Sequence, residues 1–326
     1  LYGVAIGPEV WGCQAIEFGS GDPLEFHYLG EFIALNAEHP LLRAGVVLVI
    51  AGIAFKIGAA PFQIWVPDVY HGAPTPVTCF LLVSSKAAGF FLLLNLVNGP
   101  FESLVDFLAP LLGVVATLTI FFGNLAALTQ RNVKRMLGLS GVAHAGYMLV
   151  GVIASMYFPG DSDRATWAVI FYLFAYLLAS FGTFGVMCLA RHPGGDAEQD
   201  LEHYAGFGRK RPFLAFVLTV GQASRAGLPI SAGFVAKLLL FAVAFQAKLY
   251  LSLVVMVVGV VISMYYYFGW IREALFDPPP PFSDEEVIAD PWAGADPDPT
   301  LKLTLFILTA ALLVLGLWQG PLGDVF

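Results

Sequence analysis

The sequence has few charged side chains. Only 12% of its 326 residues are Asp, Glu, Lys or Arg, against roughly 25% in ordinary soluble domains. Hydrophobic residues make up 58%, and the mean hydropathy is +0.77. A soluble protein of this length needs much more polar surface. The composition therefore excludes a soluble globular protein and indicates an all-α, polytopic transmembrane helical bundle.

Cysteine is also scarce. Cys13, Cys79 and Cys188 are scattered and have no metal-ligand or redox spacing, so they are interpreted as small packing residues. The sequence contains no dinucleotide fingerprint, no iron–sulfur cysteine pattern and no flavin motif. No cofactor is expected in this chain. The net charge of −8 is carried by loops and gives no reason to expect nucleic acid as a partner.

Lys and Arg are absent from residues 1–40, and the sequence starts at Leu1. The same segment carries six acidic residues: Glu9, Glu17, Asp22, Glu25, Glu31 and Glu38. This pattern is typical of a loop that follows a membrane span. We therefore expect 1–40 to be an extracytoplasmic loop at the end of a span that is missing from the sequence.

Long apolar stretches fill the rest of the chain. A helix needs about 20 apolar residues to cross a bilayer core of roughly 30 Å. Eight stretches meet this requirement: 42–66, 76–97, 107–128, 136–158, 165–190, 212–245, 249–271 and 301–319. We expect eight membrane spans.

Two of these stretches are expected to be discontinuous. The stretch 212–245 is too long for one straight span and contains Gly227, Pro229 and Gly233. Pro61 interrupts 42–66, five residues after Lys56. Non-helical backbone at membrane depth is tolerated only where protein or water satisfies its polar groups. Such breaks often mark the working site of a transporter.

Basic loop residues predict the orientation, because cytoplasmic loops are enriched in Lys and Arg. Alternate loops carry eight such residues: Arg131, Lys134, Arg135, Arg191, Arg209, Lys210, Arg211 and Arg272. The opposite side has three: Arg43, Arg164 and Lys248. The first side should be cytoplasmic, which makes 272–300 a cytoplasmic acidic, proline-rich loop. Residues 1–40 and the C-terminus, after the last span in 301–326, should be extracytoplasmic.

Four cations lie in the interior of the apolar stretches, away from their ends: Lys56, Lys86, Arg225 and Lys237. Each costs roughly 2.5–3.5 kcal/mol at mid-bilayer, so together they oppose insertion by about 10 kcal/mol. Lys56 and Lys86 lie about 18 Å and about 15 Å into their stretches at the helical rise. Such residues usually line a path for ions or protons. The alternative is a lysine that extends to the interface or pairs structurally with a neighbouring subunit.

The residue types suggest different roles. A desolvated lysine can exchange a proton near neutral pH, whereas arginine stays protonated. Lys56, Lys86 and Lys237 are therefore candidate proton relays, and Arg225 is a candidate fixed charge facing a cavity or a backbone carbonyl. His144 can pass a proton between its ring nitrogens or serve as a packing histidine. Tyr265, Tyr266 and Tyr267 could hydrate a path, although an aromatic helix face is favoured.

Five motifs resemble a known family. They occur in the order Phe55-Lys56-x4-Pro61-Phe62, Trp65-x-Pro67-Asp68-Val69-Tyr70-x-Gly72-Ala73-Pro74-Thr75-Pro76-Val77-Thr78, Gly123-Asn124-Leu125-x-Ala127-Leu128-x-Gln130 with Lys134-Arg135-Met136-Leu137, Ala143-His144-x-Gly146-Tyr147, and Ala226-Gly227-Leu228-Pro229 with Gly233-Phe234-x2-Lys237. The chain resembles subunit N of bacterial NADH:quinone oxidoreductase (respiratory complex I), whose mitochondrial counterpart is subunit 2. The resemblance covers about residues 41–272, and the final span also fits.

The resemblance implies an antiporter-like fold of two inverted five-helix repeats around a polar axis. Residues 41–97 would be the last two helices of the first repeat, and 107–271 the whole second repeat. Lys56 and Lys237 match the lysines of the two broken helices, while Lys86 and His144 match the axis residues. Two departures are Gln63, where histidine is common, and Arg225, where an apolar residue is usual. The family's glutamate partner of Lys56 would lie on an absent helix.

The resemblance implies a proton-translocating subunit in a bacterial plasma (inner) membrane. NADH, FMN, iron–sulfur clusters and quinone would belong to partner subunits of the enzyme complex. The expected partners are other membrane-arm subunits and the lipid bilayer. Two alternatives stay open: a subunit of a multisubunit sodium/proton antiporter, and a non-pumping scaffold of the membrane arm. The string at residues 67–74 argues against the sodium antiporter.

Overall fold

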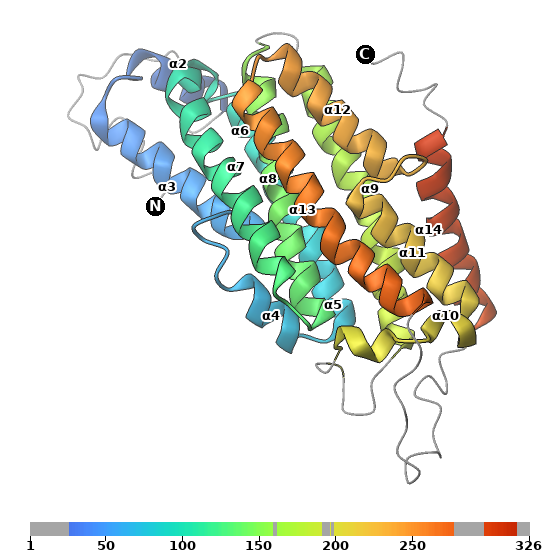
Figure 1. Ribbon diagram of the computed structural model, residues 1–326. Helices are drawn as coiled ribbons and strands as arrows, with labels where there is room; N and C mark the ends of the chain where they lie inside the picture. Colours follow the sequence, from blue (N-terminus) through green and yellow to red (C-terminus); the bar gives the residue numbers. More distant parts are fainter. Residues whose placement is uncertain (1–25, 159–161, 191–195, 197–198, 277–296, 318–326) are drawn as a thin grey trace.

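The computed structural model describes residues 26–158, 162–190, 196, 199–276 and 297–317, and these residues form helices with no strand. The elements run in the order α2 (Phe26–Leu35), α3 (Pro40–Ile57), α4 (Val66–Gly72), α5 (Thr75–Phe80), a π-helical turn η2 (Leu81–Ser85), α6 (Lys86–Val97), η3 (Glu102–Leu104), α7 (Val105–Leu128), α8 (Val133–Met156), α9 (Asp163–Leu189), η4 (Leu201–Tyr204), α10 (Phe207–Lys210), α11 (Pro212–Ala226), α12 (Ala232–Gln246), α13 (Tyr250–Leu275) and α14 (Pro299–Leu317). The long helices run side by side in one bundle (Figure 1). The predicted fold class is confirmed.

Seven helices of the described chain are long and apolar enough to cross a membrane. Their positions match seven of the eight predicted stretches. The eighth stretch, 212–245, is divided between α11 and α12, which have 15 residues each. Each of these two helices alone is too short to cross a bilayer core of roughly 30 Å, so the two together replace a single span.

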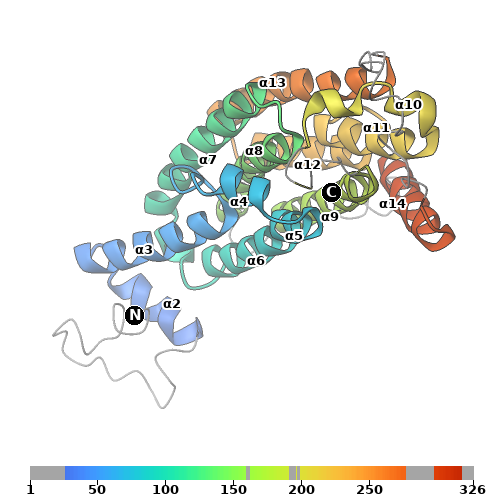
Figure 2. The same cartoon turned by 90° about the horizontal axis from the view of Figure 1, so that it is seen from below.

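Helix α8 lies at the centre of the bundle (Figure 2). It is buried along almost its whole length and contacts α4, α6, α7, α9, α12 and α13. Glycines allow the closest approaches. A Cβ on Gly123 of α7 would collide with the backbone of Ala143, and one on Gly146 would lie 2.9 Å from the Ile120 nitrogen. Small residues let membrane helices pack tightly, and here they place His144 in the middle of the bundle.

The first predicted discontinuity is confirmed at residues 58–65, between α3 and α4. Gly58 ends α3 with a φ of 73°, in the left-handed region that glycine adopts without strain. Two contacts satisfy polar groups there. The Ala60 N–H donates to Thr119 Oγ1 over 2.9 Å, and Trp65 Nε1 donates to the Phe55 carbonyl over 3.3 Å.

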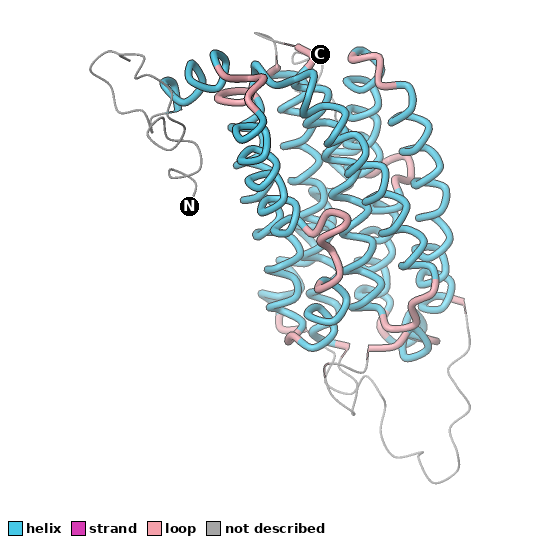
Figure 3. The backbone as a smooth tube through the Cα atoms, turned by 90° about the vertical axis from the view of Figure 1, so that its left-hand side faces the viewer, coloured by secondary structure: helices cyan, strands magenta, loops and turns pink. Residues whose placement is uncertain are grey.

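The second discontinuity separates α11 from α12 at residues 227–231. Gly227 has a φ of 85°, and its N–H donates to the carbonyls of Ala223 and Ser224. The Ser224 hydroxyl then accepts a hydrogen bond of 3.1 Å from the Gly233 N–H in the first turn of α12. Figure 3 shows loop segments that interrupt helices partway along the bundle. The glycine and proline pattern therefore located both breaks correctly.

The expected N-terminal loop segment contains a short helix, α2, at residues 26–35. The apolar residues Leu29, Phe32 and Ile33 are buried there, which gives this short segment a face to pack. The remainder of the expected loop, 1–25, lies outside the described residues, as does 277–296 of the acidic, proline-rich loop.

Candidate functional site: a buried cationic axis

Lys237 projects from α12 into the break of the preceding half-helix. Its side chain is buried, and Nζ donates hydrogen bonds to the carbonyls of Arg225 over 2.7 Å and Ala226 over 2.9 Å. These carbonyls belong to the last turn of α11, where no further helical N–H is available to them. The negative end of the α11 dipole also favours a cation. Lys237 therefore joins the two halves of the broken span.

His144 lies on α8 and hydrogen-bonds through both ring nitrogens. Nδ1 is 2.7 Å from the Tyr172 hydroxyl, and Nε2 is 3.0 Å from the Tyr267 hydroxyl. In a neutral imidazole one nitrogen donates and the other accepts. Exchange of these roles moves a proton from one side of the ring to the other, so His144 connects α9 with α13.

A second hydrogen-bonded group lies one turn away. The buried amide of Asn124 donates to the Tyr147 hydroxyl over 3.1 Å and accepts from the Tyr266 hydroxyl over 3.0 Å. The Tyr147 ring centroid lies 5.7 Å from Lys237 Nζ, within the range of cation–π attraction. This group links the lysine of α12 to α7 and α13.

Lys86 begins α6, directly after the π-helical turn η2. Single π-helical turns often occur at functional sites. The side chain is 1% exposed, and Nζ has no hydrogen-bond partner in the described part of the chain. Nζ and the Tyr176 hydroxyl approach α8 at the same place, within 3.0 Å of where a Cβ on Gly141 would lie. Gly141 precedes His144 by one helical turn, so Lys86 borders the histidine group.

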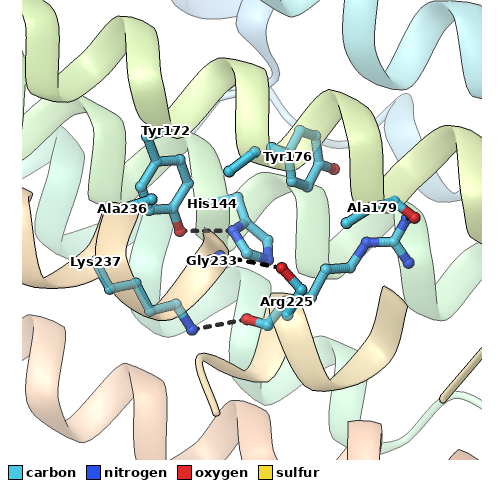
Figure 4. A pocket seen from close by; sticks show the side chains of 10 residues that line it. His144, Tyr172, Tyr176, Ala179, Arg225, Gly233, Ala236 and Lys237 are labelled. Atoms are coloured by element: carbon cyan, nitrogen blue, oxygen red, sulfur yellow. Dashed lines mark hydrogen bonds between the residues drawn. The ribbon is translucent and has the colours of Figure 1, made fainter. Parts of the chain in front are cut away.

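A small cavity of about 10 Å³ lies between these groups. It is enclosed by α8, α9, α11 and α12 and lined by ten residues: His144, Tyr172, Ala175, Tyr176, Ala179, Ser224, Arg225, Gly233, Ala236 and Lys237 (Figure 4). A site of about 10–15 Å³ holds about one water molecule. Protons can pass between adjacent hydroxyl, imidazole and ammonium groups across such a site, so the arrangement is suited to proton transfer.

The sequence of this chain matches a known protein family. Residues 12–263 match the sequence model described as "NADH:quinone oxidoreductase/Mrp antiporter, TM". The chain belongs to this transmembrane antiporter family. The motifs that suggested the resemblance, from Phe55 to Lys237, all lie within the matched segment.

Within this family, the chain is similar to curated proteins named subunit N. The chain is 51% identical to NADH-quinone oxidoreductase subunit N 1 of Opitutus terrae, over 99% of this chain and 63% of that protein. It is 38% identical to subunit N of Desulforamulus reducens, over 100% and 64%. The chain thus spans slightly less than two thirds of the length of these relatives. The resemblance to subunit N is confirmed.

Solved structures agree with this membership. The chain matches a subunit of respiratory complex I from Thermus thermophilus with a TM-score of 0.71 and 33% identity, over 90% of this chain and 64% of that one. A chain of the Mrp complex from Dietzia sp. matches with a TM-score of 0.75 at 20% identity, over 91% and 60%. The second match shows the shared fold alone. The helical bundle is therefore the antiporter-family fold.

The structure does not bring all four predicted relay residues together. Lys86, His144 and Lys237 border one buried region, but Lys56 is exposed on the outer face of α3. Its stem passes within 3.8 Å of where a Cβ on Gly89 would lie, so it runs alongside α6. In the described residues Lys56 is therefore not beside Lys86, His144 and Lys237, and its role as a proton relay stays a prediction.

Of the other residues singled out in the sequence, some are buried beside the cavity and one is exposed. Arg225 is 2% exposed, lines the cavity and donates to the Ala179 carbonyl, which confirms its position beside a cavity and a backbone carbonyl. Tyr265 is exposed, whereas Tyr266 and Tyr267 are buried and hydrogen-bonded. The three tyrosines therefore do not form one aromatic helix face, because Tyr265 is on the outside of α13 while Tyr266 and Tyr267 are in the interior.

Sequence reasoning missed the neutral residues that connect the charged ones: Asn124, Tyr172 and Tyr176. Tyr172 and Tyr176 are four residues apart, so they share one face of α9, which was an available signal. A tyrosine in an apolar helix is common, however, because its ring packs well in a core. The spacing alone therefore did not separate these residues from packing tyrosines.

The break between α11 and α12 gives a direct test of the site's packing. A Cβ on Gly233 would overlap the Ser224 carbonyl oxygen, so Gly233→Ala must displace backbone that positions Lys237. We expect it to lower stability by about 2 kcal/mol, measured as the thermal unfolding midpoint in detergent. Gly269→Ala is the matched control, because nothing lies within 4 Å of its Cβ position. Equal midpoints for the two variants would contradict the prediction.

Proposed function

We propose that this chain is part of a proton-translocating, antiporter-like subunit in the membrane arm of NADH:quinone oxidoreductase. The observation that carries the proposal is Lys86: a fully buried ammonium site with no hydrogen-bond partner in the described chain, next to the Tyr176 and His144 group. Such a lysine can bind and lose a proton without breaking a structural contact. The names of the relatives support the assignment to this enzyme.

The proposed mechanism is electrostatic. A change of charge in a neighbouring subunit alters the proton affinity of one lysine, and a proton then moves between Lys86 and Lys237 through His144. Tyr172 and Tyr267 hold the imidazole between them at 2.7 and 3.0 Å. Lys56, on the outer face, would exchange protons with a residue of another segment or subunit. These four residues are the proposed relay.

The proposed organisation follows inverted repeats. Residues 41–97 would close the first repeat, 107–271 would form the second, 272–300 would be a cytoplasmic loop and 301–326 would contain the last span. The two breaks support this division, because a basic residue precedes a left-handed glycine by two positions in both, as Lys56 before Gly58 and Arg225 before Gly227. Residues 1–40 and the C-terminus would be extracytoplasmic.

The remaining chemistry would reside in other subunits of the complex. NADH, FMN, iron–sulfur clusters and quinone are proposed to bind there, while this subunit contacts other membrane-arm subunits and lipid in a bacterial plasma membrane. No nucleic acid is proposed as a partner. Within the described residues, no group of three His, Cys, Asp or Glu side chains could hold a metal ion.

Proton uptake in inverted membrane vesicles tests the proposal. In vesicles from cells that carry the complete subunit, we expect NADH to drive uptake equally well with sodium and with choline salts. Deletion of the subunit should abolish the NADH-driven component. Sodium-dependent proton exchange without NADH would favour the competing function, sodium/proton antiport. This alternative is retained because a chain of the Mrp complex has the same fold as this chain.

A further inference from the structure

Arg225 is a buried cation without a buried anion. Its guanidinium makes two long hydrogen bonds to neutral acceptors, 3.5 Å to Gln222 Oε1 and 3.4 Å to the Ala179 carbonyl. Nε has no partner, and the buried polar side chains of the described residues include no Asp or Glu. Arginine stays charged at accessible pH, and an uncompensated buried charge costs several kcal/mol. The site therefore lacks a negative charge.

Two neighbouring groups also lack acceptors. The Tyr176 hydroxyl is buried without a hydrogen-bond partner, and so is Gln222 Nε2. The Tyr176 ring centroid lies 6.0 Å from Arg225 Cζ, and Gln222 precedes Arg225 by three residues on α11. Arg225 Nε and Gln222 Nε2 can only donate hydrogen bonds, and the Tyr176 hydroxyl can donate as well as accept. A cluster of buried donors around a permanent cation is suited to one kind of ligand, an acceptor with negative charge.

The cavity provides space beside these donors. Both Arg225 and Tyr176 line it, together with Ser224 and His144. Figure 4 shows the Arg225 side chain running from α11 towards α9, where Tyr176 and Ala179 lie. The cavity has a volume of about 10 Å³, which corresponds to about one water-sized particle. Phosphate and sulfate are polyatomic and much larger, whereas a halide ion is a single atom and is the anion type nearest to water in size.

We propose that this cavity binds a small monovalent anion of the halide type between Arg225 and Tyr176. A water molecule would satisfy some of the donors but would leave the Arg225 charge uncompensated. Lys237 does not compete for the ion, because its Nζ donates to the α11 carbonyls. The proposal does not depend on proton translocation, since it concerns only the charge balance of the interior.

The first experiment measures thermal unfolding of the intact membrane assembly that contains this chain. Bromide, chloride and gluconate salts are compared at constant ionic strength. We expect bromide and chloride to raise the unfolding midpoint in a saturable way, because an ion that binds only the folded state stabilises it. Equal midpoints in all three salts would overturn the proposal.

Three variants locate the effect. Arg225→Leu should lose the halide-dependent shift, while Arg164→Leu, at an exposed arginine in the first turn of α9, should keep it. Tyr176→Phe removes one donor to the ion and should raise the half-saturating bromide concentration about tenfold. A halide-dependent shift that survives Arg225→Leu would overturn the proposal.

A structure of the assembly determined in bromide provides an independent test, which remains valid if Arg225→Leu does not fold. We expect an anomalous bromide peak within hydrogen-bond distance of Arg225 Nε and the Tyr176 hydroxyl. The peak should be weaker in Tyr176→Phe. Density for water alone at this position, in saturating bromide, would show that the donors are hydrated and that the anion site does not exist.

Discussion

Lys86→Met should leave the subunit assembled and lower NADH-driven proton uptake by about tenfold or more. A positioned proton-transfer group contributes roughly 10²–10⁴-fold to the rate of transfer, and methionine cannot replace it. Assembly should survive because Lys86 Nζ makes no hydrogen bond within the described chain. Methionine fills a similar volume, and its neutral side chain removes the desolvation cost of an unpaired buried charge.

The measurement follows proton uptake and NADH oxidation together in inverted vesicles, after the amount of assembled complex has been matched. A lower number of protons per NADH would mean that the relay is lost while electron transfer continues. An equal fall of both rates would mean that proton transfer through Lys86 limits coupled turnover. Unchanged rates and an unchanged ratio would contradict the relay role and favour a scaffold.

Two further variants separate charge from proton exchange. Lys86→Arg retains a cation that cannot lose its proton at accessible pH, so it should fail in the same way as Lys86→Met. Lys302→Met, at an exposed lysine of α14, should leave proton uptake unchanged. Full activity in Lys86→Arg would show that only the positive charge is required at this position.

The sequence located the charged part of the site well. Charged residues are costly inside a membrane, so a lysine or histidine in the middle of an apolar stretch is informative by itself. Lys86, His144 and Lys237 were found in this way, and all three lie in the buried region. The break between α11 and α12 could also be predicted from the sequence, because Gly227 can adopt the left-handed conformation and Pro229 has no N–H to continue the helix.

The sequence could not indicate which way each helix faces. Lys56 lies as deep in its stretch as Lys86, yet its side chain is exposed because no described helix covers that face of α3. Depth along a span is a local property, whereas burial depends on distant neighbours. The hydrogen-bond partners of the site residues could not be predicted from the sequence for the same reason. Tyr267 bonds to His144 across 123 residues, and Tyr266 bonds to Asn124 across 142.

Another long-range contact supports the helix that carries Lys86. Thr75 begins α5, and Pro74 before it offers no side-chain cap. Asp196, 121 residues later, takes this role: its carboxylate accepts from the Thr75 N–H over 2.5 Å and from the Thr75 hydroxyl over 2.6 Å. A carboxylate at a helix N-terminus also interacts favourably with the helix dipole.

The same aspartate contacts Lys134 near the start of α8. Lys134 Nζ lies 3.6 Å from the Asp196 carboxylate and donates to the Ala73 carbonyl over 2.6 Å. The lysine side chain is 1% exposed and that of Asp196 is 35% exposed. Asp196 therefore connects α5, α8 and the segment that follows α9, at the end of the bundle where the Lys86 helix begins.

Asp196→Ala should destabilise the protein by about 2 kcal/mol. Hydrogen bonds to a charged group contribute roughly 1.5–3 kcal/mol each, and the partial exposure of Asp196 reduces their effect. The variant also leaves Lys134 buried without its carboxylate, so Asp196→Ala combined with Lys134→Met should be less destabilised than the sum of the two single variants. Asp200→Ala, at an exposed neighbouring aspartate, should change the thermal unfolding midpoint little.

The pH dependence of the thermal unfolding midpoint tests whether the negative charge of Asp196 is responsible for this stabilisation. Burial raises the pKa of Asp196, but hydrogen bonds from Thr75 and the Lys134 charge outweigh it and hold the pKa below its ordinary value of 3.8. Asp196 therefore binds a proton more readily in the unfolded chain. Its stabilising contribution should be complete above the ordinary pKa and lost as the pH falls through the lower pKa of the folded state. The midpoints of wild type and Asp196→Ala should accordingly differ at neutral pH and converge in acid. A difference that persists unchanged below both pKa values would show that the Asp196 contacts do not depend on its charge.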